Sequence, residues 1–383
     1  MTEIDCIIIG AGSIGIPTAM AMGEEGLKVL VIDMYPSPGQ GENKHAIGGI
    51  RATHSQKSKI LICQRSIEIF STWEEKYGDT LDWISGGYTF VAYTNEHEQL
   101  LKDTVKLQKE YGLNINYVDA DRIKELVPGI NEEDLLGGTF SPEDGNASPL
   151  KAINAFYRHT KTLGVEFKFK EQVTDLLNEN GHIKGVKTTK NTYNSQFVLN
   201  AAGSFAKEVA QMAGIDVPVV PDLHEGGITE PVKRFFYPMV VDIRPSEDSK
   251  NYYFYQNQSG KIVFCITPSP PIIGIDKRET SVFLPQIAKR MVQLVPRLKN
   301  IKVRRTWRGT YPMTPDASPI VGLVKNIDGY INAVGMCGQG YMIGPGLGEV
   351  LARLVTDKIS EKDKIILEEL SLYRDFGIME KLK

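Results

Sequence analysis

The stretch at residues 6–36, "CIIIGAGSIGIPTAMAMGEEGLKVLVIDMYP", decides the fold. Residues 6–9 form a continuous apolar run, as expected of a strand that is buried on both faces, and residues 29–32 form a second one. Between them, residues 14–22 carry small and apolar side chains at helical spacing. The stretch therefore predicts a strand, a tight turn, a helix and a second strand, which together make one βαβ unit.

Three glycines at the predicted turn form the pattern GxGxxG. Gly10 permits the tight turn, Gly12 lets the backbone approach a pyrophosphate, and Gly15 lets the helix pack close to the strand. Asp33 ends the second strand, where an acid can hold ribose hydroxyls. The alternative is a glycine turn in some other α/β fold. We predict a dinucleotide site whose contacts at this turn are Gly10, Gly12, Ser13, Ile14, Gly15 and Asp33.

The bulk composition describes an ordinary globular chain of 383 residues, long enough for two domains. A net charge of −3 gives no reason to expect nucleic acid or an anionic membrane as a partner. The four cysteines are widely spaced, which argues against a disulfide framework and a zinc site and suits a reducing compartment. No apolar run approaches the ~20 residues of a membrane span, and the N-terminal run is a poor signal peptide. We predict a cytoplasmic protein without a metal.

Two kinds of segment alternate along the chain. Segments of parallel α/β character occur at the start, middle and end, whereas residues 86–144 and 222–305 are richer in aromatic residues and typical of an antiparallel sheet. We therefore predict an α/β protein (α+β overall) with a discontinuous Rossmann-like domain and an inserted antiparallel-sheet substrate domain. The nucleotide-binding domain comprises residues 1–85, 145–221 and 306–383, and the substrate domain comprises residues 86–144 and 222–305.

Near the end of the chain, "GQGYMIGPGLGE" at residues 338–349 places several glycines and a proline before a predicted helix. Such a loop lets backbone approach a flat ring closely, and a helix N-terminus behind it favours negative charge there. The alternative is a strand-to-helix turn whose glycines only permit tight packing.

Five stretches spread over nearly the full length carry a family resemblance: "SPEDGNASP", "VLNAAGSFA", "TEPV", "TWRGTYPMTPDASPIVG" and "INAVGMCGQGYMIGPGLGEVLA". Together with the N-terminal fingerprint, they resemble the FAD-dependent D-amino-acid oxidase superfamily. More narrowly, the chain resembles its branch of sarcosine oxidase, glycine oxidase, dimethylglycine dehydrogenase and the proline dehydrogenase β subunit. The resemblance implies FAD, and further cofactor contacts from His45, Gly48, Gly49, Val173, Ala202, Gly203, Gly309, Gly338, Gln339, Gly340, Tyr341 and Met342.

The same resemblance implies a reaction. Members of this branch oxidise the carbon–nitrogen bond of a small secondary or primary amino acid by hydride transfer to the flavin, and the imine product then hydrolyses. We therefore expect a sarcosine-, glycine- or proline-like substrate. The hydride chemistry belongs to the cofactor, and the protein positions the substrate and holds its carboxylate.

Arg51, within "GGIR", is the predicted carboxylate clamp, because an arginine at the corresponding place holds the substrate carboxylate in the sarcosine oxidase branch. The planar guanidinium suits a carboxylate. The alternative is a solvated or phosphate-facing arginine. Met342 stands where some relatives have a second cation, and Tyr311 stands where glycine oxidase has an arginine. We therefore add Tyr311 and Tyr255 to Arg51 as predicted catalytic residues.

His45 matches a His-Ala pair that bonds covalently to the flavin in dimethylglycine dehydrogenase relatives. The alternatives are an unmodified histidine beside the isoalloxazine and a simple loop histidine. The cysteine tether of monomeric sarcosine oxidase falls near Gly309 and is absent. His54 and His224 receive no functional prediction.

The electron acceptor is predicted from "KIVFCIT". Relatives that react with oxygen hold a lysine over the flavin, and the corresponding position falls near Val263, which is apolar. This favours a dehydrogenase that passes electrons to a partner, such as a subunit of a hetero-oligomer. A direct oxidase producing hydrogen peroxide, an NAD-binding dehydrogenase and a non-catalytic flavoprotein subunit remain alternatives. Asp144 and Asp316 are predicted as turn formers.

Overall fold

The fold is given by a computed structural model, which describes residues 4–382. Its N-terminal unit is β1 (Ile4–Ile9), α1 (Gly15–Glu24) and β2 (Val29–Asp33). The two strands pair in parallel, with Cys6 opposite Val29 and Ile9 opposite Ile32. The predicted βαβ unit is therefore present at the start of the described chain.

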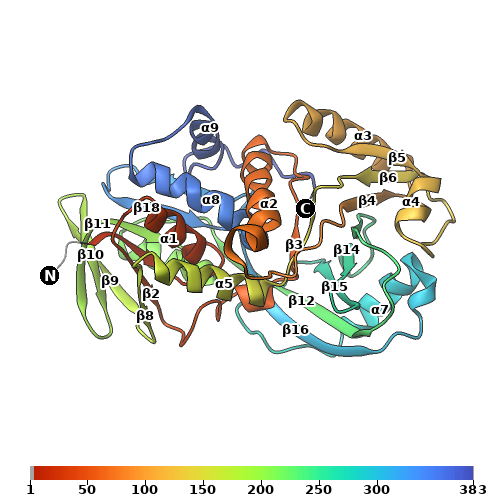
Figure 1. Cartoon of the computed structure of the whole chain (residues 1–383), viewed down its shortest axis with the longest axis horizontal. Coiled ribbons are helices and arrows are strands. Elements are labelled where there is room, and N and C mark those ends of the chain that lie inside the picture. The colour runs from red at the N-terminus through yellow and green to blue at the C-terminus, as the bar shows by residue number, and fades with distance from the viewer. Residues whose placement is uncertain (1–3, 383) are drawn as a thin grey trace.

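The first large sheet contains this unit (Figure 1). Its strands follow the order β17 (Ile320–Leu323), β18 (Tyr330–Val334), β11 (Thr192–Asn200), β1, β2 and β8 (Glu166–Phe169), and β10 (His182–Thr188) and β9 (Val173–Glu179) continue from β11. One face packs on α1, α2 (Lys57–Tyr77), α5 (Pro149–Thr162) and α8 (Gly340–Val355). The other face packs on β9, β10 and α6 (Ala206–Met212). Strands covered on both faces explain the continuous apolar runs.

The second large sheet has the order β16 (Val303–Met313), β12 (Val220–Pro231), β15 (Lys261–Pro268), β14 (Ser249–Gln256), β13 (Met239–Asp242), β4 (Tyr88–Ala92), β6 (Gly137–Phe140) and β5 (Asn116–Asp119). Its pairs are antiparallel except for β13 with β4. One face packs on α7 (Phe283–Leu294) and η3 (Pro296–Leu298), with α4 (Ala120–Leu126) beside it, and α3 (Asn95–Glu110) lies near β4, β5 and β6.

Two strands of the second sheet, β12 and β16, cross the predicted domain boundaries after residues 221 and 305, and the domain limits stay a prediction. β16 begins at Val303 and pairs with β12 along its whole length, so it belongs to the second sheet and not to the nucleotide-binding half. Short elements connect the halves: η1 (Asn43–His45), η2 (Gly203–Phe205), and the pair β3 (Gly49–Ile50) and β7 (Gly145–Asn146). The α/β fold class with mixed sheets is confirmed.

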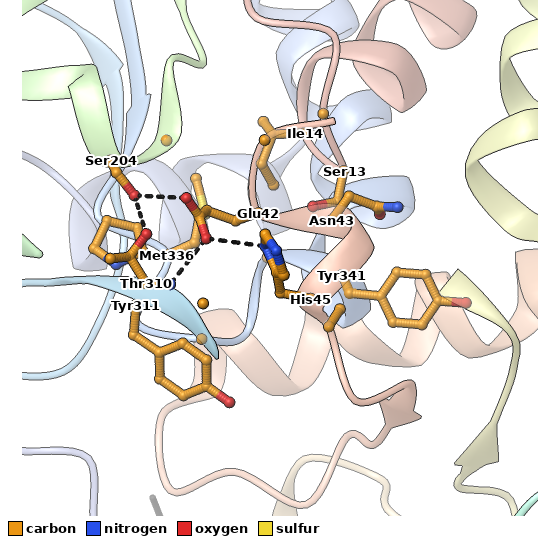
Figure 2. Close-up of a pocket in the computed structure, with 18 of the residues that line it drawn as sticks. Ser13, Ile14, Glu42, Asn43, His45, Ser204, Thr310, Tyr311, Met336 and Tyr341 are labelled. Carbon is orange, nitrogen blue, oxygen red and sulfur yellow. Dashed lines mark hydrogen bonds and ion pairs between the residues drawn. The ribbon is translucent and has the colours of Figure 1, made fainter. Parts of the chain in front are cut away.

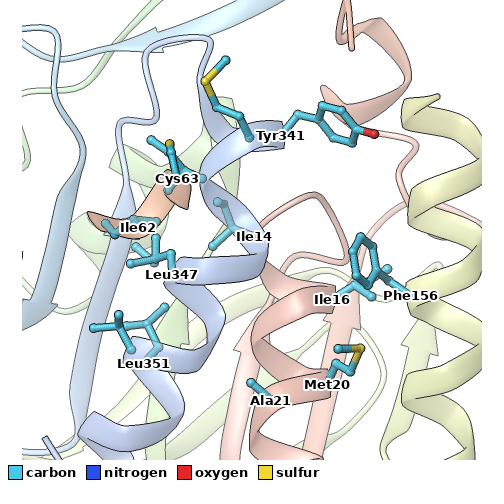
Figure 3. Close-up of a cluster of buried hydrophobic side chains, with 14 of the residues drawn as sticks. Ile14, Ile16, Met20, Ala21, Ile62, Cys63, Phe156, Tyr341, Leu347 and Leu351 are labelled. Carbon is cyan, nitrogen blue, oxygen red and sulfur yellow. The ribbon is translucent and has the colours of Figure 1, made fainter. Parts of the chain in front are cut away.

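The glycine-rich segment near the end of the chain differs from the predicted loop. α8 begins at Gly340, so the part predicted as a loop before the helix is already helical, with Pro345 inside the helix. A Cβ at Gly344 would overlap the Ser13 carbonyl oxygen, and one at Gly346 would overlap that of Ile62. These two glycines therefore let α8 pack closely against the start of α1 and against α2, as Figure 3 shows for the side chains around them.

The last part of the described chain returns to the middle of the molecule. α9 (Glu361–Glu369) packs on α2, and the following residues run to the end marked C, which lies near α2 and β3 in Figure 1. Among the helices of residues 4–382, none combines the length and apolar character that crossing a bilayer requires.

Candidate functional site

A cavity of about 430 Å³ lies between the two sheets. The β1–α1 turn, the end of β2, η1, η2 and the start of α8 line it from the nucleotide-binding half. Residues of β4, β12, β13, β14, β15 and β16 line it from the second sheet. Every predicted site residue lies at this cavity except Gly15 and Tyr255.

The fingerprint glycines divide into two packing glycines and one that faces open space. Gly10 has a φ of +112°, and a Cβ there would overlap the carbonyl oxygen of Ala201. A Cβ at Gly15 would overlap the carbonyl oxygen of Gly10, so Gly15 allows the helix to sit on the strand. A Cβ at Gly12 would meet no atom within 4 Å. Gly12 therefore keeps space open at the cavity wall, where a pyrophosphate needs it.

Asp33 lies at the same end of the cavity. Its carboxylate accepts hydrogen bonds from the backbone N–H of Ala11 at 2.7 Å and of Tyr35 at 2.8 Å. Burial raises the pKa of this carboxyl, although both hydrogen bonds oppose the shift. Val173 lines the same cavity, and so does Gly203, where an added Cβ would meet no atom within 4 Å. These residues fit the ribose and adenine end of a dinucleotide.

Glu42 is the centre of a polar network that the sequence analysis missed (Figure 2). Its carboxylate accepts from the backbone N–H of Thr310 at 2.8 Å and from the Ser204 hydroxyl at 3.2 Å. Lys277 Nζ lies 2.5 Å from Oε1, and His45 Nδ1 lies 3.6 Å from Oε2. Burial alone would raise the Glu42 pKa, but His45 and Lys277 lower it to about 2. Glu42 thus joins η1, η2 and β16 around the cavity.

His45 and Gly309 are packed against each other. A Cβ at Gly309 would lie 2.7 Å from the Cβ of His45, so the glycine makes room for the histidine. The indole N–H of Trp307 donates to the His45 carbonyl oxygen at 2.8 Å. Both residues line the cavity, and the covalent link between His45 and flavin stays a prediction.

Gly48 and Gly49 also line the cavity, but their neighbours are protein atoms. A Cβ at Gly48 would lie 2.7 Å from the Tyr255 hydroxyl, and one at Gly49 would lie 2.7 Å from the Tyr88 hydroxyl. These glycines allow close packing of the loop on the second sheet.

Two buried amide oxygens at the cavity support a bound polar ligand. Asn43 Oδ1 and Gln339 Oε1 have no hydrogen-bond partner among the described residues. Buried polar groups without a partner are rare, and each calls for an explanation. Together with the open space at Gly12 and Gly203, these groups fit a long ligand with hydroxyl and N–H donors, as FAD is.

Arg51 is buried, with 6% of its surface exposed, at the wall of the cavity. Its Nη1 donates to the Thr53 carbonyl oxygen, and its Nη2 donates to the Leu382 carbonyl oxygen at 2.5 Å. The guanidinium carbon lies 5.9 Å from the ring centre of Tyr88 and 5.3 Å from that of Phe90. A guanidinium carries five N–H donors, so donors remain for a carboxylate in the cavity.

Tyr311 meets a second tyrosine at the cavity. Its hydroxyl lies 2.9 Å from that of Tyr253, and its ring stacks on His224 with a centroid distance of 3.8 Å. Burial raises the pKa of both tyrosines, so both hydroxyls are protonated donors at neutral pH. A Cβ at Gly338 would overlap the Tyr311 ring, which explains the glycine there.

The structure does not bring Tyr255 to the cavity with the other two predicted catalytic residues, and its catalytic role stays a prediction. Its hydroxyl donates to the Ile47 carbonyl oxygen at 2.6 Å and supports the loop before Gly48, outside the cavity lining. Tyr253, two residues earlier on the same face of β14, lines the cavity instead. On β15 the residues of the lining are Cys265 and Thr267 and not Val263, and the lining contains no lysine among the described residues.

Several other lining residues were missed: Glu42, Asn43, Tyr88, Phe90, Ser204, His224, Asn251, Tyr253, Cys265, Thr267 and Thr310. Some follow predicted contacts directly in the sequence, as Ser204 follows Gly203 and Thr310 follows Gly309. That adjacency is the signal that could have found them. Within residues 4–382 no group of three His, Cys, Asp or Glu side chains is arranged to hold a metal ion.

Similar proteins agree with this architecture. The family described as FAD dependent oxidoreductase matches residues 5–354. The solved L-proline dehydrogenase from P. horikoshii has a TM-score of 0.91 and 29% identity, covering 98% of this chain and 99% of that one. The glycine oxidase from Geobacillus kaustophilus has a TM-score of 0.86 and 20% identity, covering 98% of this chain and 100% of that one, a likeness of fold.

The curated relatives are longer. Mitochondrial dimethylglycine dehydrogenase of Rattus norvegicus is 24% identical over 369 residues, covering 91% of this chain and 42% of the relative. Hydrogen cyanide synthase subunit HcnC of Pseudomonas aeruginosa is 26% identical over 286 residues, covering 74% of this chain and 66% of the relative. The chain spans about two fifths of the length of the dimethylglycine dehydrogenase it matches.

The fold and the cavity are those of a flavoprotein, in which the sheet that carries the βαβ unit and the second sheet together line a cavity with residues that would hold FAD. The chain belongs to the FAD dependent oxidoreductase family and is therefore a protein that binds FAD.

Proposed function

We propose that this protein oxidises the carbon–nitrogen bond of a small secondary or primary amino acid that is sarcosine-, glycine- or proline-like. We further propose that the electrons pass from the flavin to a partner protein and not directly to oxygen. The relatives named as dehydrogenases of dimethylglycine and L-proline support the substrate class.

The observation that carries the proposal is the buried guanidinium of Arg51 at the cavity wall. A buried cation needs compensation, and the carbonyls of Thr53 and Leu382 supply only part of it. A substrate carboxylate would complete that compensation through charge-assisted hydrogen bonds. Lysines are absent from the described lining, so Arg51 is the side chain best suited to this role.

The tyrosine pair supplies the second set of contacts. FAD, when bound, accepts the hydride from the substrate carbon. The hydroxyls of Tyr253 and Tyr311 are protonated and meet at the cavity, where they can hold the amino group or the second carboxylate oxygen. The apolar residues Met239 and Val241 line the same cavity, which favours a small substrate with an apolar body.

The choice of acceptor rests on β15. Cys265 and Thr267 face the cavity where an oxygen-activating lysine would be expected from the family, and Lys261 lies outside the lining. One matched relative is named as an enzyme subunit, which supports a partner that takes the electrons. The second candidate, an oxidase that makes hydrogen peroxide, predicts rapid flavin reoxidation in air.

An anaerobic reduction panel tests the proposal. We expect sarcosine, glycine or L-proline to bleach the visible absorbance of the bound flavin, and slow reoxidation when oxygen is admitted. Arg51→Ala should retain FAD but need at least about tenfold more substrate for half-maximal reduction, since two charge-assisted hydrogen bonds are lost. Arg51→Lys keeps the charge without the planar fork and serves as the matched control.

Three outcomes would contradict parts of the proposal. If no amino or imino acid reduces the flavin, the protein is a non-catalytic flavoprotein. If Arg51→Ala releases FAD and leaves substrate binding intact, the arginine serves the cofactor. Stoichiometric hydrogen peroxide with fast reoxidation would support the oxidase instead.

A further inference from the structure

We propose that residues 371–382 complete the substrate site, and that Glu380 is a positioning residue that seats this segment so that the Leu382 carbonyl orients Arg51. The inference rests on the proposed function, because it assumes that Arg51 holds a carboxylate.

The segment is anchored first at Asp316. The Arg374 guanidinium forms two hydrogen bonds to the Asp316 carboxylate, at 2.7 Å and 2.9 Å, and both side chains are buried. The backbone N–H of Glu380 donates to the Asp316 carbonyl oxygen at 3.2 Å. Asp316 also accepts from the Ser318 N–H at 3.2 Å, so the predicted turn role and the anchoring role coexist.

The second anchor is the side chain of Glu380. Its Oε2 lies 2.6 Å from Lys59 Nζ, and both side chains are fully buried. Its Oε1 accepts from the hydroxyl and the backbone N–H of Ser55, at 2.6 Å and 2.9 Å. His54 Nδ1 lies 3.7 Å from Oε2. The Glu380 carboxylate therefore contacts both the loop that follows β3, at Ser55, and the first turn of α2, at Lys59.

The Glu380 anchor places a charged carboxylate in the interior of the protein. Burial would raise the Glu380 pKa, but the charge of Lys59 and the contact with His54 keep it well below its usual range. A buried ion pair contributes little net stability but fixes geometry, and removing one partner leaves an uncompensated charge. A segment held in this way has a defined position.

The anchored segment reaches Arg51 through the residues after Glu380. The backbone N–H of Lys381 donates to the Ser55 hydroxyl at 2.9 Å, and that of Leu382 donates to Glu380 Oε1 at 3.1 Å. These bonds aim the Leu382 carbonyl at Arg51 Nη2. The Leu382 side chain is 2% exposed and packs in one cluster with Tyr88 and Phe90, the rings beside the guanidinium.

The consequence is a guanidinium that is oriented before a substrate arrives. Arginine has several rotatable bonds, and ordering such a side chain on binding costs conformational entropy. Two backbone carbonyls accept hydrogen bonds from Nη1 and Nη2 and fix the guanidinium of Arg51, a residue of the cavity lining, while other donors of the group remain. Losing the Leu382 carbonyl should weaken carboxylate binding without changing the flavin.

The experiment compares the FAD-loaded chain of residues 1–383 with a variant lacking residues 378–383 and with Glu380→Gln. The first readout is acetate affinity, measured by perturbation of the flavin absorbance without turnover. The second is KM and kcat with whichever of sarcosine, glycine and L-proline reduces the flavin. We expect both variants to keep FAD, to weaken acetate binding and raise KM about tenfold, equivalent to about 1.4 kcal/mol, and to keep kcat within about twofold.

The controls separate positioning from general damage. Glu380→Asp should recover part of the affinity, and a peptide of residues 378–383 added to the truncated protein should restore it. Glu361→Gln, in an exposed ion pair of α9, should change nothing. Should the truncated protein fail to fold, Glu380→Gln carries the test alone.

Unchanged or tighter acetate binding in FAD-loaded Glu380→Gln would overturn the inference, since tighter binding would mean that the segment competes with the substrate. Arg51→Ala is measured in parallel. If Arg51→Ala also leaves acetate affinity unchanged, the proposed function fails. If only Arg51→Ala weakens binding, the positioning role fails alone.

Discussion

At the scale of single residues, the cavity surrounds one buried cation with aromatic and carbonyl groups. Arg51 lies between the rings of Tyr88 and Phe90 and two backbone carbonyls, so its charge is partly compensated without a carboxylate of its own. Asp144 is fully buried near it, and burial raises the pKa of Asp144 to about 7. A site that keeps its cation incompletely neutralised is suited to binding an anion.

Substitution of Tyr311 and of Tyr255 tests which hydroxyl contacts the substrate and which one supports the fold. Tyr311→Phe removes a protonated donor at the cavity, so we expect KM to rise up to about tenfold, the value of one hydrogen bond, with FAD retained. Tyr255→Phe removes the donor to Ile47, so we expect stability to fall by about 1 kcal/mol with KM unchanged. Steady-state kinetics and urea unfolding measure the two effects.

Tyr252 provides the matched control for these tyrosines. It is buried on the opposite face of β14, and its hydroxyl has no hydrogen-bond partner among the described residues. Tyr252→Phe should change neither KM nor stability by much. A KM effect from Tyr255→Phe equal to that from Tyr311→Phe would restore Tyr255 as a substrate contact.

The places of Tyr253 and Tyr255 show what alternation in a strand can predict. Tyr253 and Tyr255 point to the same face because side chains alternate with a period of two. The alternation of side chains therefore indicates which face of β14 meets the cavity, but not which position along the strand lines the cavity. That position depends on how far β14 extends past the loop at Ile47, which is a contact between distant parts of the chain.

At the scale of elements, the βαβ unit allows a sharp test of its glycines. Gly12→Ala adds a methyl group where no atom lies within 4 Å, so the apoprotein should fold with its stability nearly unchanged. The methyl group occupies pyrophosphate space, so we expect FAD affinity to fall at least about tenfold. Gly15→Ala pushes α1 off the Gly10 carbonyl and should cost several kcal/mol, about the upper range of overpacking.

Thermal unfolding of the apoproteins and titration with FAD distinguish the two variants. Gly26→Ala is a useful comparison, since an added Cβ meets nothing within 4 Å but φ is +81°, so only the backbone is strained. Equal destabilisation by Gly12→Ala and Gly15→Ala would contradict the division into a cofactor glycine and a packing glycine.

The βαβ unit was predictable because its signals are local, whereas the start of α8 at Gly340 was not. Glycine and proline are poor helix formers, so residues 340–346 favoured a loop on propensity alone. The helix forms because Gly344 and Gly346 bring its backbone against α1 and α2, and that packing overrides propensity. The role of Asp316 was half predicted for the same reason, since its turn is local but Arg374 is distant.

At the scale of the whole molecule, buried carboxylates connect segments that are far apart in the sequence. Glu42 joins η1 to β16, and Glu380 joins the last described residues to α2. Both connections depend on ionised carboxylates beside cations. Neither could be found from composition or spacing, because exposed and buried acids look alike in a sequence.

The acid stability of the protein should therefore depend on Glu42 and Glu380. Both have a pKa below the usual value in the folded state, so the unfolded state takes up protons first when the pH falls below about 4.5. Stability is lost there, by up to about 1.4 kcal/mol per pH unit for each group. Burial raises the pKa of Asp144 to about 7, so protonation of Asp144 makes the folded state more stable as the pH falls from about 7 to about 4. Burial lowers the pKa of His54, so His54 has the opposite effect on the stability of the folded state.

We therefore expect a small net slope between about pH 7 and pH 5 and a steep loss of stability below about pH 4.5, measured by urea unfolding. Glu380→Gln should be less stable at pH 7 and show a shallower acid slope, because one of the two titrating groups is gone. Glu361→Gln, whose carboxylate is exposed, should follow the parent curve. If the free energy of unfolding depends on pH in the same way for Glu380→Gln and for the parent, the buried Lys59–Glu380 pair does not determine the loss of stability at acid pH.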